Sequence, residues 1–388
     1  MALTRRHFLL GLSVGTGSIL LAACGGTPTA TPAPATSAPT SAPTTAGAST
    51  AAGAPTASVS RTASPAISSP IASGSPAASG PLKQVRVGYV PVLVYSPIFI
   101  AMEKGYFRDQ GIETVATPFT GGSDILAQTS SGNLEVGLSG LGASALNAFQ
   151  RGLDLRIVSS QHTESPPLAT PLVVARKKYD DGTYKKVADL KGKKVAINAK
   201  GTGTEYWLQA ALAKNGLTMK DVDLTALAFD QVAAALNGGS LDGAMLGEPL
   251  VTLAEAQGLV YRLADDFLTN AQGTVIFYNL KWGRDNAALA DRWLAAWLKG
   301  ARDLDNGGYA KDENAAIIEK FTKTPAATVK AAKPPRHEPN GALNLADMKA
   351  QQEYFLTSGS LTYNTALDLN NLIDTGFADR AVAIIGKK

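Results

Sequence analysis

The sequence contains very little cysteine and histidine. Its 388 residues include one cysteine, Cys24, and three histidines. One cysteine excludes an intramolecular disulfide framework. A metal site needs clustered His, Cys, Asp or Glu at defined spacing, and no such cluster is found. We therefore predict a chain with no metal site and no cofactor.

The sequence also lacks a large excess of charge of either sign. It has 36 Lys and Arg against 32 Asp and Glu, a formal net charge of +4, of which Arg5 and Arg6 supply two. A nucleic-acid-binding domain is expected to carry a basic stripe or patch. The near-neutral balance argues against nucleic acid as a partner.

Long apolar runs are missing except near the N-terminus. There the run from Phe8 to Ala23 is shorter than the roughly 20 residues that span a bilayer. It follows Arg5-Arg6-His7-Phe8-Leu9, which resembles a twin-arginine export signal. It ends at Leu21-Ala22-Ala23-Cys24, which resembles a bacterial lipobox. We predict that residues 1–23 are a cleaved lipoprotein signal peptide. The exported protein is then expected at the outer face of the cytoplasmic membrane, anchored by a lipid on Cys24, or in the periplasm.

A low-complexity stretch follows. Residues 24–82 consist almost entirely of Thr, Ala, Pro, Ser and Gly, with Arg61 as the only charge before Lys83. Such a composition buries too little apolar surface to offset the entropy of ordering. We predict that this stretch is a disordered linker that holds the folded domain away from the membrane.

From Lys83 onward, predicted strands alternate with predicted helices, which indicates an α/β fold with largely parallel sheets. A first series has strands at 85–90, 112–115, 136–138 and 155–159 and helices at 98–104, 124–130 and 143–151. A second series has strands at 171–175, 194–198, 224–229 and 243–246 and helices at 205–214 and 231–236. One more strand, 275–278, precedes a mostly helical region with helices at 289–304 and 345–357.

An ordered set of short motifs runs through this part of the chain: Ala101-Met102-Glu103-Lys104-Gly105-Tyr106-Phe107, Leu190-Lys191-Gly192-Lys193-Lys194-Val195-Ala196, Gly201-Thr202-Gly203 and Gly247-Glu248-Pro249. The set resembles the SsuA-like family, the substrate-binding proteins of ABC importers for nitrate, sulfonates, taurine and thiamine precursors. The resemblance implies a two-lobed periplasmic-binding-protein-like (type II) fold. Lobe I would comprise 83–172 and 274–388, and lobe II 173–273. Two crossover strands would lie near 172–175 and 273–277.

In open α/β sheets, ligands bind at the carboxyl ends of the strands. The residues there are rich in glycine and hydroxyl groups, which suit an anionic group at helix N-termini. The same residue types also form ordinary tight turns and N-caps. The candidate ligand-binding residues are Tyr89, Tyr95, Ser96, Thr120, Gly121, Gly122, Ser123, Ser139, Gly140, Gly142, Ala143, Ser144, His162, Thr202, Gly203, Thr204 and Glu248, with Tyr206 or Trp207 as a further aromatic candidate.

Two of these candidates have specific alternatives. Glu248 either accepts hydrogen bonds from an amine on the ligand or bridges the two lobes. A carboxylate opposes a bare anion, so Glu248 favours a zwitterionic ligand. His162 is expected to be a hydrogen-bonding or packed residue rather than a metal ligand.

The sequence therefore predicts a monomeric binding protein, not an enzyme, that closes on a small solute and delivers it to an ABC permease and its ATPase. One alternative is an enzyme on the same fold, similar to pyrimidine synthases with a Cys- and His-rich iron site; the lack of cysteine in the folded part disfavours it. Another alternative is a sensory or adhesion module without transport, which the neighbouring genes would distinguish.

Overall fold

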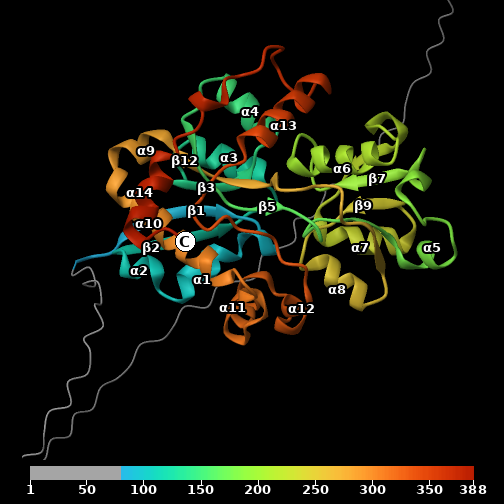
Figure 1. Cartoon of the computed structure of the whole chain (residues 1–388), viewed down its shortest axis with the longest axis horizontal. Helices are drawn as coiled ribbons and strands as arrows, with labels where there is room; N and C mark the ends of the chain where they lie inside the picture. Colours follow the sequence, from blue (N-terminus) through green and yellow to red (C-terminus); the bar gives the residue numbers. More distant parts are fainter. Residues whose placement is uncertain (1–79) are drawn as a thin grey trace, which may run out of the picture. The chain divides into compact units, whose positions relative to one another are not determined.

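The computed structural model of the chain describes residues 80–388. The predicted signal peptide, Cys24 and nearly all of the predicted linker lie outside this range. Two five-stranded sheets form the framework, each with helices on its faces. We call the first sheet with its helices lobe I and the second lobe II. Figure 1 shows β1, β3 and β12 in one lobe, β7 and β9 in the other, and β5 between them.

The sheet of lobe I has the strand order β2-β1-β3-β12-β4. Its central strand β3 pairs in parallel with β1 and antiparallel with β12, which enters the sheet after the chain has passed through lobe II. The strands are β1 (Lys83–Tyr89), β2 (Ile112–Pro118), β3 (Val136–Gly140), β4 (Leu155–Ser160) and β12 (Thr274–Asn279), and the helices between them are α1 (Ser96–Glu103), α2 (Tyr106–Asp109), α3 (Gly122–Ser130) and α4 (Ala143–Gln150).

The sheet of lobe II has the order β10-β6-β9-β7-β8. Here β7 pairs in parallel with β8 and β9, whereas β6 is antiparallel to β9 and β10. The strands are β6 (Leu172–Ala175), β7 (Lys194–Ile197), β8 (Asp223–Ala226), β9 (Gly243–Met245) and β10 (Val260–Ala264), and the helices are α5 (Arg176–Asp180), α6 (Gly203–Lys214), α7 (Phe229–Gly238) and α8 (Leu250–Ala256).

After β12 the chain is mostly helical and packs largely on lobe I. In its longest helix, Trp293 and Trp297 are fully buried, and Gly300 lies so close to α1 that an ideal Cβ there would be 2.2 Å from the carbonyl oxygen of Pro97. The helices are α9 (Leu280–Asp285), α10 (Ala287–Leu304), α11 (Asp312–Thr322), α12 (Ala326–Ala331), α13 (Leu345–Thr357) and α14 (Gly376–Ile385). Short 3-10 turns cover Leu93–Tyr95, Val187–Leu190, Met219–Asp221, Gly308–Ala310 and Leu369–Asn371.

Two very short strands join the lobes, β5 (Thr163–Glu164) and β11 (Ala271–Gln272), and they pair antiparallel with each other. This corrects the predicted crossovers. Residues 172–175 form β6 inside the sheet of lobe II, and 274–279 form β12 inside the sheet of lobe I. The actual crossovers lie just before each of these strands.

The structure confirms the α/β fold and corrects two details of it. Both sheets are mixed rather than largely parallel, because β12 inserts antiparallel between β3 and β4, and β6 inserts antiparallel between β9 and β10. The predicted strand at 224–229 ends at Ala226, and α7 already begins at Phe229. Within residues 80–388, no helix is both long enough and apolar enough to cross a membrane.

Candidate functional site

A pocket lies between the two lobes, with about 800 Å³ of empty space that includes solvent at its mouth. Both lobes and the two crossovers contribute to its lining. The lining residues are Val90, Val92, Val94, Tyr95, Gly122, Ser123, Leu126, Ser139, Gly140, Gly142, Ser144, Ala145, His162, Thr170, Asn198, Gly201, Thr202, Gly203, Thr204, Trp207, Phe229, Gly247, Glu248, Gly273 and Thr274.

Besides α7, whose first residue Phe229 lines the pocket, three helices begin here: α3 and α4 of lobe I and α6 of lobe II. Residues in the first turn of each of these three line the pocket. None of the three has a side-chain cap on its N-terminus. Two of the N-cap residues are Gly121 and Gly142, and a glycine has no side chain with which to cap. The third is Thr202, whose hydroxyl turns away to the carbonyl of Ala199 at 2.7 Å.

The amides at the start of a helix have no intrahelical acceptor, and the helix dipole adds positive potential there. A helix N-terminus without a side-chain cap is therefore available to an acceptor from outside the helix. Three of them at one pocket, contributed by both lobes, form a donor-rich surface suited to an anion. The suitability of this surface for an anion comes from uncapped backbone amides and not from cationic side chains.

A backbone acceptor already meets one of these N-termini. The amide of Ala143, at the start of α4, donates to the carbonyl of Gly201 in lobe II at 2.7 Å. On another side of the pocket, the amide of Leu93 donates to the carbonyl of Glu248 at 3.0 Å. These two hydrogen bonds join the lobes directly across the pocket.

Side chains of α6 and α13 also join the lobes. The hydroxyl of Tyr354 donates to Glu205 at 3.2 Å, and the hydroxyl of Tyr206 donates to Asp347 at 3.3 Å. Burial, together with the nearby Asp347 carboxylate, raises the pKa of Tyr206 to about 12. The hydroxyl of Tyr206 therefore stays protonated and remains a donor over the physiological pH range.

Glu248 is the only acidic residue among the lining residues, and its carboxylate accepts from several protein donors. It accepts from Thr252 Oγ1 at 2.9 Å and from the backbone amides of Thr252 and Lys333 at 3.2 and 2.9 Å, and it forms an ion pair with Arg262. Its side chain is completely buried. The carboxylate therefore ties α8, β10 and the segment after α12 together.

His162, just before β5, lies at the crossover and also lines the pocket. Its Nδ1 accepts a hydrogen bond from the backbone amide of Thr274 at 3.0 Å and contacts the hydroxyl of the same residue at 2.7 Å. Because Nδ1 is an acceptor, the neutral ring carries its proton on Nε2. The ring packs so closely on Gly273 that an ideal Cβ there would be 2.2 Å from Cε1.

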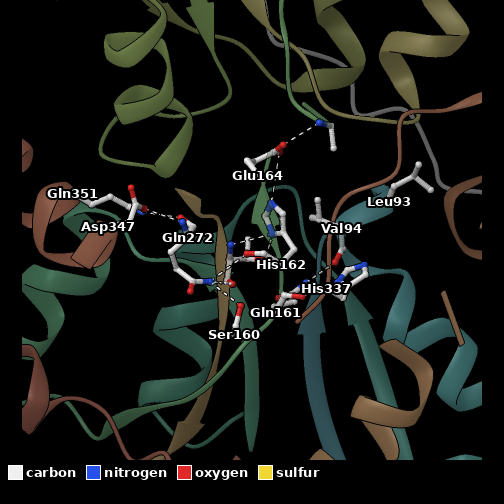
Figure 2. A network of polar contacts seen from close by, with 12 residues as sticks. Leu93, Val94, Ser160, Gln161, His162, Glu164, Gln272, His337, Asp347 and Gln351 are labelled. Atoms are coloured by element: carbon white, nitrogen blue, oxygen red, sulfur yellow. Dashed lines mark hydrogen bonds and ion pairs between the residues drawn. The ribbon is translucent and has the colours of Figure 1, made fainter. Parts of the chain in front are cut away.

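The Nε2 atom of His162 faces a second buried group. Figure 2 shows the carboxylate of Glu164 facing the ring, with 3.7 Å between Nε2 and Oε1. This distance is too long for a hydrogen bond, and neither atom has another partner among the described residues. The same region of the structure, residues 80–388, holds no group of three or more His, Cys, Asp or Glu placed to bind a metal ion.

A polar network connects this crossover to α13, as Figure 2 shows. Gln272 donates from its side chain to Ser160 Oγ at 3.0 Å, and its backbone amide donates to Asp347 at 2.8 Å. Gln351 donates to the carbonyl of Gln272 at 2.7 Å and to Asp347 at 2.8 Å. The crossover β11 is therefore fixed to lobe I through α13.

The structure brings most of the predicted site residues to one pocket. Those in the lining are Tyr95, Gly122, Ser123, Ser139, Gly140, Gly142, Ser144, His162, Thr202, Gly203, Thr204 and Glu248. Of the alternative aromatic candidates, Trp207 lines the pocket and Tyr206 does not. Burial raises the pKa of Tyr95, which keeps its phenol neutral.

The other five predicted residues lie outside the lining, for distinct reasons. Tyr89 points into the core of lobe I, edge-on to Phe99 at 5.1 Å between ring centroids. Ser96 is fully buried at the start of α1, and Thr120 is exposed to solvent. Gly121 lies one residue outside α3, and the amide of Ala143 is bonded to Gly201.

The sequence analysis missed two kinds of lining residue. Asn198 directly follows β7 and Gly247 lies two residues after β9, so the strand-end rule that selected Thr202 also applies to them. The apolar residues Val90, Leu126 and Phe229 carry no signal in the sequence that separates them from core residues.

In a comparison with known protein families, residues 78–320 match the NMT1-like family. The chain belongs to this family. The match includes both sheets and α3, α4 and α6.

Three relatives illustrate the likeness. A putative binding protein of Brucella abortus is 30% identical over 168 residues, which is 43% of this chain and only 49% of the relative. The riboflavin-binding protein RibY of Chloroflexus aurantiacus is 28% identical over 61% of this chain and 67% of RibY. The alkanesulfonate-binding protein SsuA of Xanthomonas axonopodis, solved with MOPS bound, matches with a TM-score of 0.62 at 21% identity, covering 74% of this chain and 97% of SsuA.

These findings confirm the resemblance to SsuA-like substrate-binding proteins that the motifs indicated. The solved structure also confirms the periplasmic-binding-protein fold. The chain spans about half the length of the Brucella relative.

Proposed function

We propose that this chain is an exported solute-binding protein of an ABC importer, which captures a small solute with an anionic group and presents it to a permease and its ATPase. The observation that carries the proposal is the meeting of three helix N-termini without side-chain caps, from both lobes, at one pocket. SsuA, with a similar fold, is an alkanesulfonate-binding protein.

The mechanism we propose is hinge closure about β5 and β11. These two short strands are the crossovers between the lobes, and the pocket lies beside them. A ligand that accepts hydrogen bonds from α3 and from α6 contacts both lobes only when they are closed. Such a ligand shifts the equilibrium toward the closed form by its differential affinity.

The sharpest test removes one backbone donor from the pocket. Gly203 is the first residue of α6, a position where proline is well tolerated, and the extended backbone of Thr202 is compatible with a following proline. Gly203→Pro therefore deletes an N–H and leaves the helix intact. Loss of a hydrogen bond to a charged group, about 1.5–3 kcal/mol, lowers anion affinity about 10- to 150-fold.

Gly203→Ala is the matched control, because it keeps the N–H and its Cβ would meet nothing closer than 3.5 Å. Isothermal titration of the full-length protein with alkanesulfonates, nitrate and taurine measures the affinities. Loss of affinity in the proline variant alone supports the proposal. Equal affinities of the two variants, or no binding by the unmodified protein, would contradict it.

We also propose that the protein is a monomer held at the membrane by a lipid on Cys24. The support is the arrangement of signal, lipobox and linker in the sequence. Cys24→Ala removes the only thiol of the chain, so the variant should move from the membrane fraction to the soluble fraction on cell fractionation. Membrane association equal to that of the unmodified protein would disprove the anchor.

A second candidate ligand class is an uncharged aromatic heterocycle such as a flavin or a thiamine precursor. Two observations favour it: the aromatic side chains of Tyr95, Trp207 and Phe229 in the lining, and the riboflavin-binding relative. Aromatic faces stack on such rings. Titration with riboflavin tests this candidate, and a heterocycle bound equally well by Gly203→Pro and Gly203→Ala would identify it.

A further inference from the structure

A third segment of the chain passes through the hinge, besides β5 and β11. It runs from Lys333 to His337, between α12 and α13, and we call these five residues the strut. The amide of Thr163 in β5 donates to the carbonyl of Arg336 at 2.9 Å, and the two residues form an antiparallel bridge. Thr163 also pairs with Gln272 of β11. Therefore β5 lies between β11 and the strut.

The end of the strut at His337 is held by lobe I. The ring donates from Nδ1 to the carbonyl of Gln161 at 2.6 Å, and Figure 2 shows the two residues side by side. In the neutral ring Nε2 is then an acceptor, and the hydroxyl of Tyr309 donates to it at 2.7 Å. Tyr309 is buried in one apolar cluster with Leu93 of lobe I. This end of the strut is therefore fixed to lobe I.

The other end of the strut is held by lobe II. The amide of Lys333 donates to Oε1 of Glu248, between β9 and α8, at 2.9 Å, and we call this hydrogen bond the latch. The carboxylate is fully buried, and it is oriented by an ion pair with Arg262 and by the hydroxyl of Thr252. A hydrogen bond from an amide to a carboxylate is stronger than one between neutral groups. These contacts fit the bridging role of Glu248, one of the two that the sequence left open.

The strut is stiff between its two ends. Pro334 and Pro335 have fixed φ angles and no N–H, and a residue before a proline is restricted to extended backbone. In the proposed hinge closure, lobe II moves relative to lobe I about β5 and β11. A stiff segment fixed to lobe I does not follow Glu248 when lobe II moves away. The latch is therefore a contact of the closed form alone.

We propose that the strut is a third hinge element, and that Glu248 is the positioning residue that latches it and so favours the closed form. This inference rests on the proposed function and adds a control of closure that lies in the protein rather than in the ligand. Lys333 lies outside the pocket lining, so its amide acts on closure and not on the ligand. A change in the latch should therefore alter the affinity for every ligand that closes the lobes by the same factor.

The test deletes the donor of the latch. Lys333→Pro removes the N–H, and two features of the backbone make proline compatible with this position. Ala332 is extended, with φ −63° and ψ 156°, as a residue before proline should be, and residue 333 itself already precedes a proline. Lys333→Ala is the matched control, because it keeps the N–H and changes only an exposed side chain.

Two measurements on the full-length protein cover both possible states of the empty protein. If it is mostly open, isothermal titration with hexane-1-sulfonate and riboflavin detects the loss. If it is mostly closed, the loss is seen without ligand in the hydrogen-exchange protection of the Ala143 amide, whose acceptor Gly201 lies in the other lobe. Loss of a hydrogen bond to a charged group should lower affinity or protection about 10- to 150-fold in Lys333→Pro relative to Lys333→Ala. Amides of β3 should keep their protection, which a general loss of stability would lower.

A second variant tests the stiffness of the strut and serves in place of Lys333→Pro if that variant does not fold. Pro334→Gly keeps the amide of Lys333 and deletes no N–H, but it gives the unlatched strut more conformational freedom. The same measurement should fall about two- to fivefold, which is the factor that a restricting proline normally contributes. An unchanged value would overturn the stiff strut.

The possible results separate the latch from the function on which it rests. If neither measurement distinguishes Lys333→Pro from Lys333→Ala, or if two probes lose affinity by different factors, the inference is overturned. The proposed function still stands in that case if Gly203→Pro weakens the binding of hexane-1-sulfonate. If the protection of Ala143 falls as expected and none of the alkanesulfonates, nitrate, taurine or riboflavin binds, the latch stands and the proposed function fails.

Discussion

The direct contact between Gly142 and Gly201 gives a prediction whose size can be worked out from the structure. Gly142 is the N-cap of α4 in lobe I, and an ideal Cβ there would lie 2.1 Å from the carbonyl oxygen of Gly201 in lobe II. Real Cβ atoms essentially never come closer than 3.0 Å. Gly142→Ala therefore forces the lobes about 0.9 Å apart at this point (3.0 − 2.1).

Two costs fall on the closed form alone. The hydrogen bond from Ala143 to Gly201 is lost, which costs about 1 kcal/mol. Relieving the overlap costs about 1–3 kcal/mol, as in other overpacked sites. The sum, about 2–4 kcal/mol, lowers the ratio of closed to open protein about 30- to 700-fold, since 1.4 kcal/mol is a factor of ten. Ligand affinity should fall by the same factor.

Gly121→Ala is the control because Gly121 is the N-cap of α3, has an extended backbone, and its Cβ would meet nothing within 4 Å. Isothermal titration with hexane-1-sulfonate measures affinity, and small-angle scattering with saturating ligand measures closure. Thermal unfolding checks that both variants keep their lobes folded. If Gly142→Ala binds and compacts like Gly121→Ala, direct contact between the lobes contributes nothing to closure.

Two further predictions concern the histidines of lobe I. Gly273→Ala would place its Cβ 2.2 Å from the ring of His162, so it should lower the free energy of unfolding, measured in urea, by about 1–3 kcal/mol. Gly140→Ala is the control: its Cβ would meet nothing closer than 3.9 Å, so it should lower the free energy of unfolding by less than about 1 kcal/mol. Equal losses in the two variants would refute the tight packing of the ring. Burial lowers the pKa of His337 to about 3, while the unfolded chain binds the proton near 6.5. This contribution to stability is complete above pH 6.5 and is lost at up to about 1.4 kcal/mol per pH unit as pH falls toward 3. His337→Asn should flatten the loss seen by urea unfolding at pH 7, 6 and 5, and an unchanged slope would contradict the burial of a neutral ring.

The sequence predicted those helices and strands whose own residues form a recognisable local pattern. The helix predicted at 345–357 has these bounds in the structure, and the strands at 136–138 and 194–198 lie within one or two residues of β3 and β7. The two strands are apolar runs, and the helix begins at a capping residue, Asn344. The strand-end rule then placed Ser139 and Thr202 at the pocket, because it depends only on the order of strands and turns.

What the sequence did not predict depends on contacts between distant residues. The crossovers β5 and β11 have two residues each, too few for any periodicity. Whether Tyr89 or Val90 faces the pocket depends on which face of β1 the helices of lobe I cover, and the core takes Tyr89. The contacts of the Glu248 carboxylate depend on Arg262 and Lys333, which the chain order alone does not bring together.

In the proposed hinge closure, the cross-lobe hydrogen bond at α4 makes closing of the lobes and ligand binding reinforce each other. The carbonyl of Gly201 occupies one amide at the N-terminus of α4, so the closed protein already supplies an acceptor there. The N-termini of α3 and α6 receive no cap from a side chain, and their first residues lie at the same pocket. The proposed anionic ligand is the acceptor for the amides of α3 and α6, as the carbonyl of Gly201 is for an amide of α4. Because α3 and α6 belong to different lobes, an anion gains both sets of donors only in the closed form, and its binding energy is thereby converted into closure.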